Sequence, residues 1–296
     1  SVSREIRRNT PLFRLVRYRG NRAQQRAAAR SRRSHARRRP ANPVVRSYGE
    51  SHPVNDGRTP QEIAGRLPLD HQGRSTNWES IYHWIYEERR DLITYLPKAH
   101  RKRHKRLKGK KNRAAKIPNR ADITGRSPDI ERRDEAGHWE IDTVVSRQSK
   151  VCVAVLVERK TRYYLGFRME DKSVRSMRRA WEKALRRLPP RRHRSLTYDN
   201  GLENALHELV HEALGTKSYF CKPYHSWEKG SIENRNGILR RYYPKKHDFA
   251  LTSQKEINRI VRRINSTPMK CFRTKVRGYR TPAEVFAKYG GVALAG

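Results

Sequence analysis

The sequence predicts an α/β domain with a mixed sheet whose first three strands are antiparallel, preceded by a smaller helical region. Three observations support this prediction. Apolar runs of strand length follow one another closely after residue 135, and two capped helical segments lie between residues 58 and 97. The chain also carries 69 Lys and Arg against 29 Asp and Glu, so the segments outside these regions bury little.

The net charge of +40 predicts strong, salt-sensitive binding to a polyanion. The longest apolar run, Val151 to Val157, is far too short to span a bilayer, and no signal-peptide pattern opens the chain. We therefore expect nucleic acid, DNA or RNA, and not a membrane, as the partner.

The three cysteines, Cys152, Cys221 and Cys271, are widely separated and show no zinc-binding spacing. Neither a disulfide framework nor a zinc site is expected, which favours a reducing, cytoplasmic compartment. Cys152 lies within an apolar run, where it is expected to be a buried small hydrophobe.

Residues 1–50 form a basic segment in which the only acidic side chain before Gly49 is Glu5. Such a segment is either disordered or a basic helix that DNA orders, and the helix-forming residues from Arg22 to Arg30 leave both alternatives open. Residues 3–9 have the pattern of a helix end without its beginning. The segment is therefore expected to be the remnant of a truncated DNA-binding region.

Residues 51–97 contain two helix starts. Thr59 and Glu62 form a capping box around Pro60, and a second start follows at Thr76 to Glu79. Two short capped helices in a basic protein indicate a helix-turn-helix whose second helix reads DNA, although a helical pair that merely packs is the alternative. The residues expected to contact DNA here are Arg74, Asn77, Tyr82 and His83.

Residues 98–134 are expected to be a basic linker. The stretch from Arg101 to Arg113 contains no acidic residue and few apolar ones. It is predicted to lie along the DNA backbone, with phosphate contacts from Arg101, Lys102, Arg103, Lys105 and Arg106.

Residues 135–296 alternate between strand and helix patterns. Strands are expected at 139–145, 150–157, 163–169, 195–198 and 218–221, and helices at 173–188, 203–214, about 233–243 and 253–265. Three strands, helix, strand, helix, strand, helix is the order of a ribonuclease-H-like domain.

Three carboxylates stand out within this order. Asp142 is on the first strand, Asp199 follows the fourth, and Glu233 is on a helix that packs across the same edge, 33 residues separating the last two. Repulsion would raise their pKa values unless cations lie between them. Two Mg²⁺ or Mn²⁺ ions would then support in-line displacement at phosphorus.

Simpler explanations exist for each carboxylate. Asp142 alone is a solvated strand end, and Asp199-Asn200-Gly201 alone is a turn in which Gly201 would tolerate a positive φ. Other side chains near enough to compete as ligands are Glu140, Glu203, Glu228 and His138.

The residues around the carboxylates are candidates for DNA contact. Asn236 and Arg240 share a helix face with Glu233, and Lys229 adds charge. Trp139 and Trp227 could stack on bases, although aromatic residues at such positions belong to the core more often.

Several blocks of this sequence resemble the signature blocks of IS-thirty family transposases of bacterial insertion sequences. They are Gly137-His-Trp-Glu-Ile-Asp142, Tyr198-Asp-Asn-Gly-Leu-Glu203, residues 223–237, Tyr242-Tyr-Pro-Lys245 and residues 278–286. The resemblance extends through residues 61–67, 79–86 and 3–9, so it covers nearly the whole chain. Ile141, Asn204 and the residues between Cys271 and Gly278 depart from the family pattern.

The resemblance implies a DDE transposase with a ribonuclease-H-like, integrase-type catalytic domain at 135–296. It would use Mg²⁺ or Mn²⁺ to cleave and rejoin DNA at inverted-repeat ends, acting as a homo-oligomer in the bacterial cytoplasm and nucleoid. The catalytic and metal-binding roles carry over to Asp142, Asp199 and Glu233. A non-catalytic, repressor-like remnant and a nuclease of the same fold are the alternatives.

Overall fold

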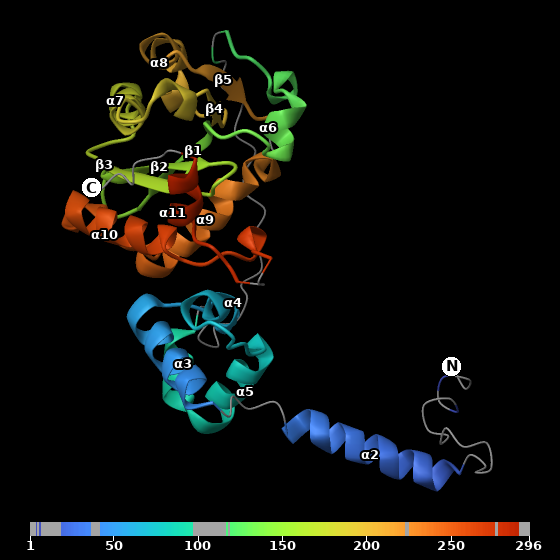
Figure 1. The fold of residues 1–296 in the computed structure, drawn as a ribbon. Helices are drawn as coiled ribbons and strands as arrows, with labels where there is room; N and C mark the ends of the chain where they lie inside the picture. The colour runs from blue at the N-terminus through green and yellow to red at the C-terminus, as the bar shows by residue number, and fades with distance from the viewer. Residues whose placement is uncertain are drawn as a thin grey trace. The chain divides into compact units, whose positions relative to one another are not determined.

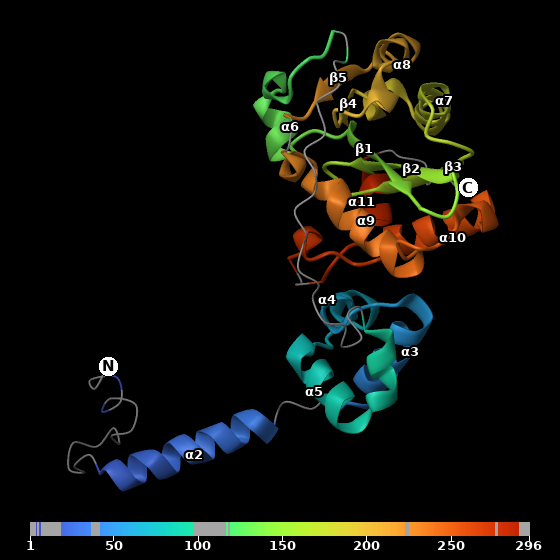
Figure 2. The same cartoon turned by 180° about the vertical axis from the view of Figure 1, so that it is seen from behind.

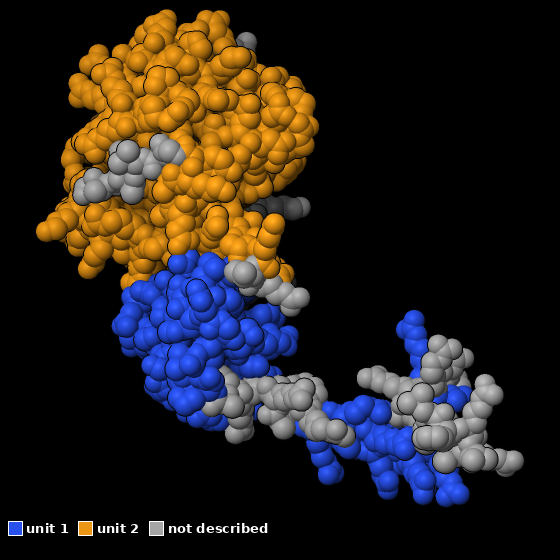
Figure 3. All heavy atoms as spheres, viewed as in Figure 1, with its two compact units in different colours: residues 1–100, 276–278 blue, residues 101–275, 279–296 orange. Residues whose placement is uncertain are grey.

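The computed structural model describes residues 4, 6, 19–36, 42–96, 117, 119–222, 225–275 and 278–289. The chain divides into two compact units. Unit 1 comprises Ser1–His100 with Val276–Gly278, and unit 2 comprises Arg101–Lys275 with Tyr279–Gly296 (Figure 3). Within the described residues, no helix is long and apolar enough to cross a membrane.

Unit 1 is helical. Its elements are α2 (Gly20–Ala36), α3 (Pro43–Asp56), α4 (Pro60–Asp70), α5 (Trp78–Glu88) and the 3-10 helix η1 (Arg90–Tyr95). A small apolar core joins α3, α4, α5 and η1, and its fully buried members include Ile63, Leu67 and Ile85. Residues 20–36 of the basic segment are helical, as α2.

Helix α3 differs from the expectation for residues 1–50. It crosses residue 50, where the sequence suggested a domain boundary, and it buries Val45, Tyr48 and Gly49. The helix begins with Asn42 as N-cap and ends at Gly57, whose φ is 63°. The residues before it are dense in arginine, whereas α3 itself contains only Arg46, so the charge pattern of residues 1–50 taken as a whole concealed a helix that packs.

The two predicted helix starts in unit 1 are both present. Thr59 and Glu62 form the capping box of α4, as the sequence predicted. Helix α5 begins one residue later than predicted, because Asn77 and not Thr76 is its N-cap and accepts a hydrogen bond from Glu79 N at 3.2 Å. Helix α4 runs through Pro68, so the connection between the two helices covers residues 71–77.

This cap assignment predicts a difference between neighbouring variants. Asn77→Ala should lower the free energy of unfolding of unit 1 by about 1 kcal/mol, because the first turn of α5 loses its side-chain acceptor. Thr76→Ala should change it by much less. Urea unfolding of the two variants beside the parent chain measures the difference. An equal loss in both would contradict the assignment of the cap.

Unit 2 is built on a five-stranded mixed sheet of order β3-β2-β1-β4-β5. Its strands are β1 (His138–Val145), β2 (Cys152–Glu158), β3 (Tyr164–Met169), β4 (Ser195–Tyr198) and β5 (Lys217–Phe220). β1, β2 and β3 pair antiparallel, whereas β4 is parallel to both β1 and β5. This confirms the mixed sheet that begins with three antiparallel strands.

Strand β2 is buried along its whole length because both faces of the sheet are covered. Its side chains alternate between two cores: Cys152, Ala154 and Leu156 enter one, and the valines at 153, 155 and 157 enter the other. The same alternation on β1 turns Trp139 and Ile141 to the first core. The acidic residues of β1 therefore lie on the second face.

Helices cover the two faces of the sheet. The α-helices are α6 (Pro128–Arg132), α7 (Val174–Leu185), α8 (His207–Leu214), α9 (Gly230–Tyr242), α10 (Gln254–Asn265) and α11 (Pro282–Lys288). Helix α7 lies on one side of the sheet, and α9 and α10 on the other, as the opposite views in Figure 1 and Figure 2 show. Short 3-10 helices complete the unit at residues 123–125, 190–192, 202–204, 226–229, 249–251 and 270–272.

Two details of this unit differ from expectation. Helices α6 and α11 were not predicted, since each is only five to seven residues long. Gly201 has φ −72°, so the turn does not use the positive φ that a glycine would tolerate there. The chain leaves β4 through a side-chain turn in which Asp199 Oδ1 accepts a hydrogen bond from Gly201 N at 3.3 Å, so no left-handed residue is required.

Candidate active site

The register of β1 against β4 brings two of the predicted carboxylates together. Glu140 pairs with Thr197 in this parallel ladder. Asp142 lies two residues after Glu140 on β1, and Asp199 lies two residues after Thr197, directly after the end of β4. Neighbouring parallel strands advance together, so the two aspartates stand at the same level of the sheet although 57 positions separate them (199 − 142).

Both carboxylate oxygens of Asp142 are engaged. Oδ1 accepts a hydrogen bond from Thr143 N at 2.9 Å, and Oδ2 accepts one from Asn236 Nδ2 at 2.8 Å. Asn236 is itself oriented by the buried Tyr164, whose hydroxyl donates to Asn236 Oδ1 at 3.0 Å. The carboxylate thus has a fixed orientation on the face of the sheet that α9 covers.

Burial is the main reason that the pKa of Asp142 is raised above its ordinary value. Lys229 and the Thr143 amide lower this pKa, and Asp199 makes a smaller raising contribution. The sequence-based argument expected repulsion between carboxylates to dominate. Repulsion is secondary because an ammonium group lies between the two aspartates.

That ammonium group belongs to Lys229, which immediately precedes α9. Its Nζ lies 3.8 Å from Asp142 Oδ1 and 3.5 Å from Asp199 Oδ2, and it donates a hydrogen bond to Ile141 O at 3.0 Å. Only 8% of its side chain is exposed. Lys229 was expected to meet the DNA backbone, but the structure buries it between the two aspartates.

Asp199 is held by the residues that follow it. Its Oδ1 accepts a hydrogen bond from Asn204 Nδ2 at 2.8 Å, in addition to the one from Gly201 N, and Oδ2 faces Lys229. Asn204 is buried at the end of a 3-10 turn. Sequence reasoning noted Asn204 only as a departure from the family pattern, yet it orients this carboxylate.

Glu233 projects from the first turn of α9 and is exposed. Lys229 precedes it by four residues and Asn236 follows it by three, so the three share one side of the helix. Both neighbours contact Asp142, so this side of α9 is turned to Asp142. Among the described residues, however, no three Asp, Glu, His or Cys side chains form a group that could hold a metal ion.

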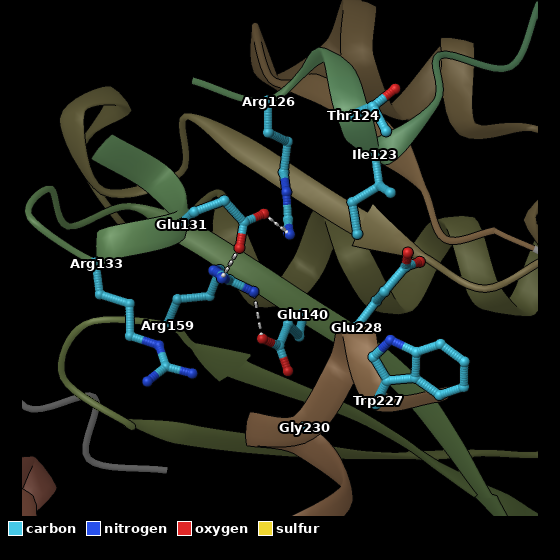
Figure 4. Close-up of a pocket in the computed structure, with 10 residues that line it drawn as sticks. All are labelled: Ile123, Thr124, Arg126, Glu131, Arg133, Glu140, Arg159, Trp227, Glu228 and Gly230. Carbon is cyan, nitrogen blue, oxygen red and sulfur yellow. Dashed lines mark hydrogen bonds and ion pairs between the residues drawn. The ribbon is translucent and has the colours of Figure 1, made fainter. Parts of the chain in front are cut away.

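Glu140, the nearest competitor for a ligand role, belongs to a buried ionic network. Its Oε1 accepts from Arg159 Nη1 at 2.7 Å and its Oε2 from Ile232 N at 2.9 Å. Arg159 also contacts Glu131, which binds Arg126. Figure 4 shows this network in a pocket of about 520 Å³ whose wall includes Trp227. Glu140 therefore anchors the start of α9 to β1.

The other competitors also have structural partners. Glu203 pairs with Lys172 at 2.5 Å. Glu228 accepts a hydrogen bond from Lys222 N at 2.8 Å, and His138 shares one with Ser195 Oγ at 2.7 Å. These contacts leave Asp142 and Asp199 as the pair that shares one cation.

The predicted DNA contacts in unit 1 have varied surroundings. Arg74 donates to Asn42 Oδ1 at 2.7 Å, Asn77 caps α5, and His83 is exposed. Tyr82 is half-buried and its ring lies 6.2 Å from that of Tyr86. The five linker residues proposed to contact phosphate, at positions 101, 102, 103, 105 and 106, lie outside the described residues.

The remaining residues predicted to contact DNA in unit 2 differ in how far they are bound within the protein or exposed. Asn236 is bound to Asp142, and Arg240 donates to Val145 O at 2.7 Å. Trp139 is fully buried, whereas 67% of Trp227 is exposed and its ring stacks on His225 at 4.3 Å. Of the two tryptophans, only Trp227 is accessible to a base.

Comparison with known proteins identifies the family. An integrase core domain model matches residues 132–226. The transposase for insertion sequence element IS4351 of Bacteroides fragilis is 35% identical over 290 residues, which are 97% of this chain and 85% of that protein. Transposase InsI for insertion sequence element IS30A of Escherichia coli (strain K12) is 33% identical over 246 residues, 80% of this chain and 62% of that protein. The chain belongs to the IS30 family of insertion-sequence transposases.

This membership confirms the resemblance in the sequence, and with it the DDE type and the integrase-like core. The IS30 family belongs to the DDE enzymes, which generally use a divalent metal and act on DNA. Among solved structures, the catalytic core domain of BIV integrase is 17% identical and covers 52% of this chain and 96% of its own. Its TM-score is 0.38.

Proposed function

We propose that this IS30-family chain binds the inverted-repeat ends of an insertion sequence and catalyses metal-dependent strand cleavage and strand transfer. Asp142, Asp199 and Glu233 are its catalytic carboxylates. The observation that carries this proposal is the convergence of Asp142 and Asp199 on a single cation, the ammonium of Lys229. Two carboxylates that meet at the end of a sheet, within a net charge of +40, suit phosphoryl transfer on a polyanion.

The donor set is compatible with Mg²⁺ or Mn²⁺, and we propose two ions. Carboxylate oxygens are the ligands that these hard cations prefer, and Lys229 already marks the place where Asp142 and Asp199 share positive charge. When bound, the metal would activate the attacking oxygen and stabilise the leaving one. Glu233, on the side of α9 that faces Asp142, would complete the ligand set.

The reaction consists of two displacements at phosphorus. In the first, water forms a bond to phosphorus and the bond to the 3′ oxygen breaks, which leaves a 3′ hydroxyl. In the second, that hydroxyl attacks a phosphodiester of the target strand, whose own 3′ oxygen leaves. Asn236 and Asn204 hold Asp142 and Asp199 in fixed orientations throughout, so the carboxylates need little reorganisation.

DNA binding is proposed for both units. In unit 1, α5 is the recognition helix of a helix-turn-helix, with Arg74, Asn77, Tyr82 and His83 near the DNA, and the basic linker residues contact phosphates. Arg240 supplies a contact near the site in unit 2. Transposition joins two ends of one element, so we propose a homo-oligomer on DNA.

A short duplex that carries the terminal repeat, incubated with target DNA, tests this function. Nicked and joined products should form with Mg²⁺ or Mn²⁺ and be absent with a chelator. Nicked product alone would favour a nuclease of the same fold. Binding without any cleavage would favour a non-catalytic, repressor-like remnant.

A further inference from the structure

The Lys229 ammonium occupies the space between the two catalytic aspartates. Its distances of 3.8 Å to Asp142 Oδ1 and 3.5 Å to Asp199 Oδ2 make it the cation that the two carboxylates share. Without it, the two carboxylates would face one another with no cation between them. The group therefore has an electrostatic effect on the site before any metal binds.

Three features fix this lysine in place. Its Nζ donates to Ile141 O on β1, its side chain is almost fully buried, and the backbone of α9 is tied to β1 through Ile232 N and Glu140. A flexible surface lysine would swing away at little cost, but this one has a packed stem and a third acceptor. The ammonium is thus a built part of the site.

A divalent cation needs the same carboxylate oxygens. To bind Asp142 Oδ1 and Asp199 Oδ2, it either displaces the ammonium or stays beside it against like-charge repulsion. Both routes weaken metal binding relative to a site without the lysine. Asn236 and Asn204 keep the two carboxylates oriented while this exchange takes place.

We propose that Lys229 is a positioning residue that holds Asp142 and Asp199 together in the metal-free protein and competes with the metal for them. The inference rests on the proposed metal dependence of the reaction. If Lys229 competes in this way, the affinity of the site for metal is low when no DNA is bound. A gain in affinity, and not a loss, is therefore expected when the lysine is removed.

Calorimetric titration of the full chain with Mn²⁺, in the absence of DNA, tests this inference. Lys229→Met should bind Mn²⁺ at least about tenfold more tightly than the parent chain does. Mn²⁺ should therefore raise the Tm of Lys229→Met by more than it raises the Tm of the parent. Lys229→Arg keeps the positive charge and should remain close to the parent. Lys160→Met is the matched control, since its ammonium donates to Asp134 O at 2.5 Å and lies over the ring of Tyr289.

The outcomes separate the two proposals. If the parent chain binds Mn²⁺ and Lys229→Met binds it equally or more weakly, the proposed role of Lys229 is wrong, but the proposed metal site stands. If neither the parent chain nor any variant binds Mn²⁺, the proposed metal site at Asp142 and Asp199 is wrong as well. If Lys229→Met does not fold, as judged by circular dichroism, Lys229→Gln replaces it with the same expected gain.

Discussion

Asp199→Asn should abolish both strand cleavage and strand joining, a loss on the order of 10³-fold or more, while the protein still folds and binds DNA. Asparagine keeps the size of the side chain and an oxygen that can accept from Asn204 and Gly201 N. It removes the negative charge at Oδ2, the oxygen that faces the shared cation position. The chemistry should therefore fail without collapse of the turn.

The measurement is a gel assay of labelled terminal-repeat duplex, with mobility-shift binding run on the same protein. Glu203→Gln is the matched control, because Glu203 lies four residues away and pairs with Lys172. It should retain most of the activity. Glu233→Gln should behave like Asp199→Asn. Cleavage at the parental rate in Asp199→Asn would refute the assignment of the active site.

The strands and long helices of unit 2 were predictable because their patterns are local. The continuous apolar run at 151–157 fits a strand buried on both faces, and Ser195 to Tyr198 was placed correctly to the residue. Ser173 caps the predicted helix at its start, but the helix ends at Leu185, three residues before the Leu188 end that Pro189 and Pro190 had predicted. The location of Asp142 on the first strand and of Asp199 after the fourth followed from these elements.

The surroundings of the carboxylates could not be predicted, because they depend on contacts between residues distant in sequence. Tyr164 reaches Asn236 across 72 positions, and Lys229 reaches Ile141 across 88. In a chain with 69 basic residues, nothing local distinguishes a lysine that points inward from one that meets DNA. Sequence reasoning therefore assigned Lys229 and Asn236 to a DNA surface.

The same limit applies to Glu140 and Asp142, which lie on the same face of one strand only two positions apart. From sequence both were candidates for a ligand role. The structure separates them, because Arg159 neutralises Glu140 and Ile232 N donates to it, whereas Asp142 meets Lys229 and Asn236. Charge neutralisation by a residue 19 positions away decides which acid is structural.

Arg159→Met should lower the free energy of unfolding of unit 2 by about 3–5 kcal/mol. Glu140 and Arg159 are 1% and 3% exposed, and their ion pair at 2.7 Å is surrounded by protein. Removal of the arginine leaves a buried carboxylate without its counter-charge, and Glu131 and Ile130 O lose a donor as well. Urea unfolding followed by circular dichroism measures the loss.

Two further variants show whether this buried pair causes the loss. Arg132→Ala removes an arginine that is 61% exposed and pairs with Asp134 at 2.8 Å, so the free energy of unfolding should change far less than in Arg159→Met. The double variant with Glu140→Gln and Arg159→Met should regain part of the stability, because no unpaired buried charge remains. Glu140 also accepts from Ile232 N, where α9 begins, so the same pair fixes the helix that carries Glu233. If Arg159→Met lowered the free energy of unfolding no more than Arg132→Ala does, the pair of Glu140 and Arg159 would not be what anchors α9.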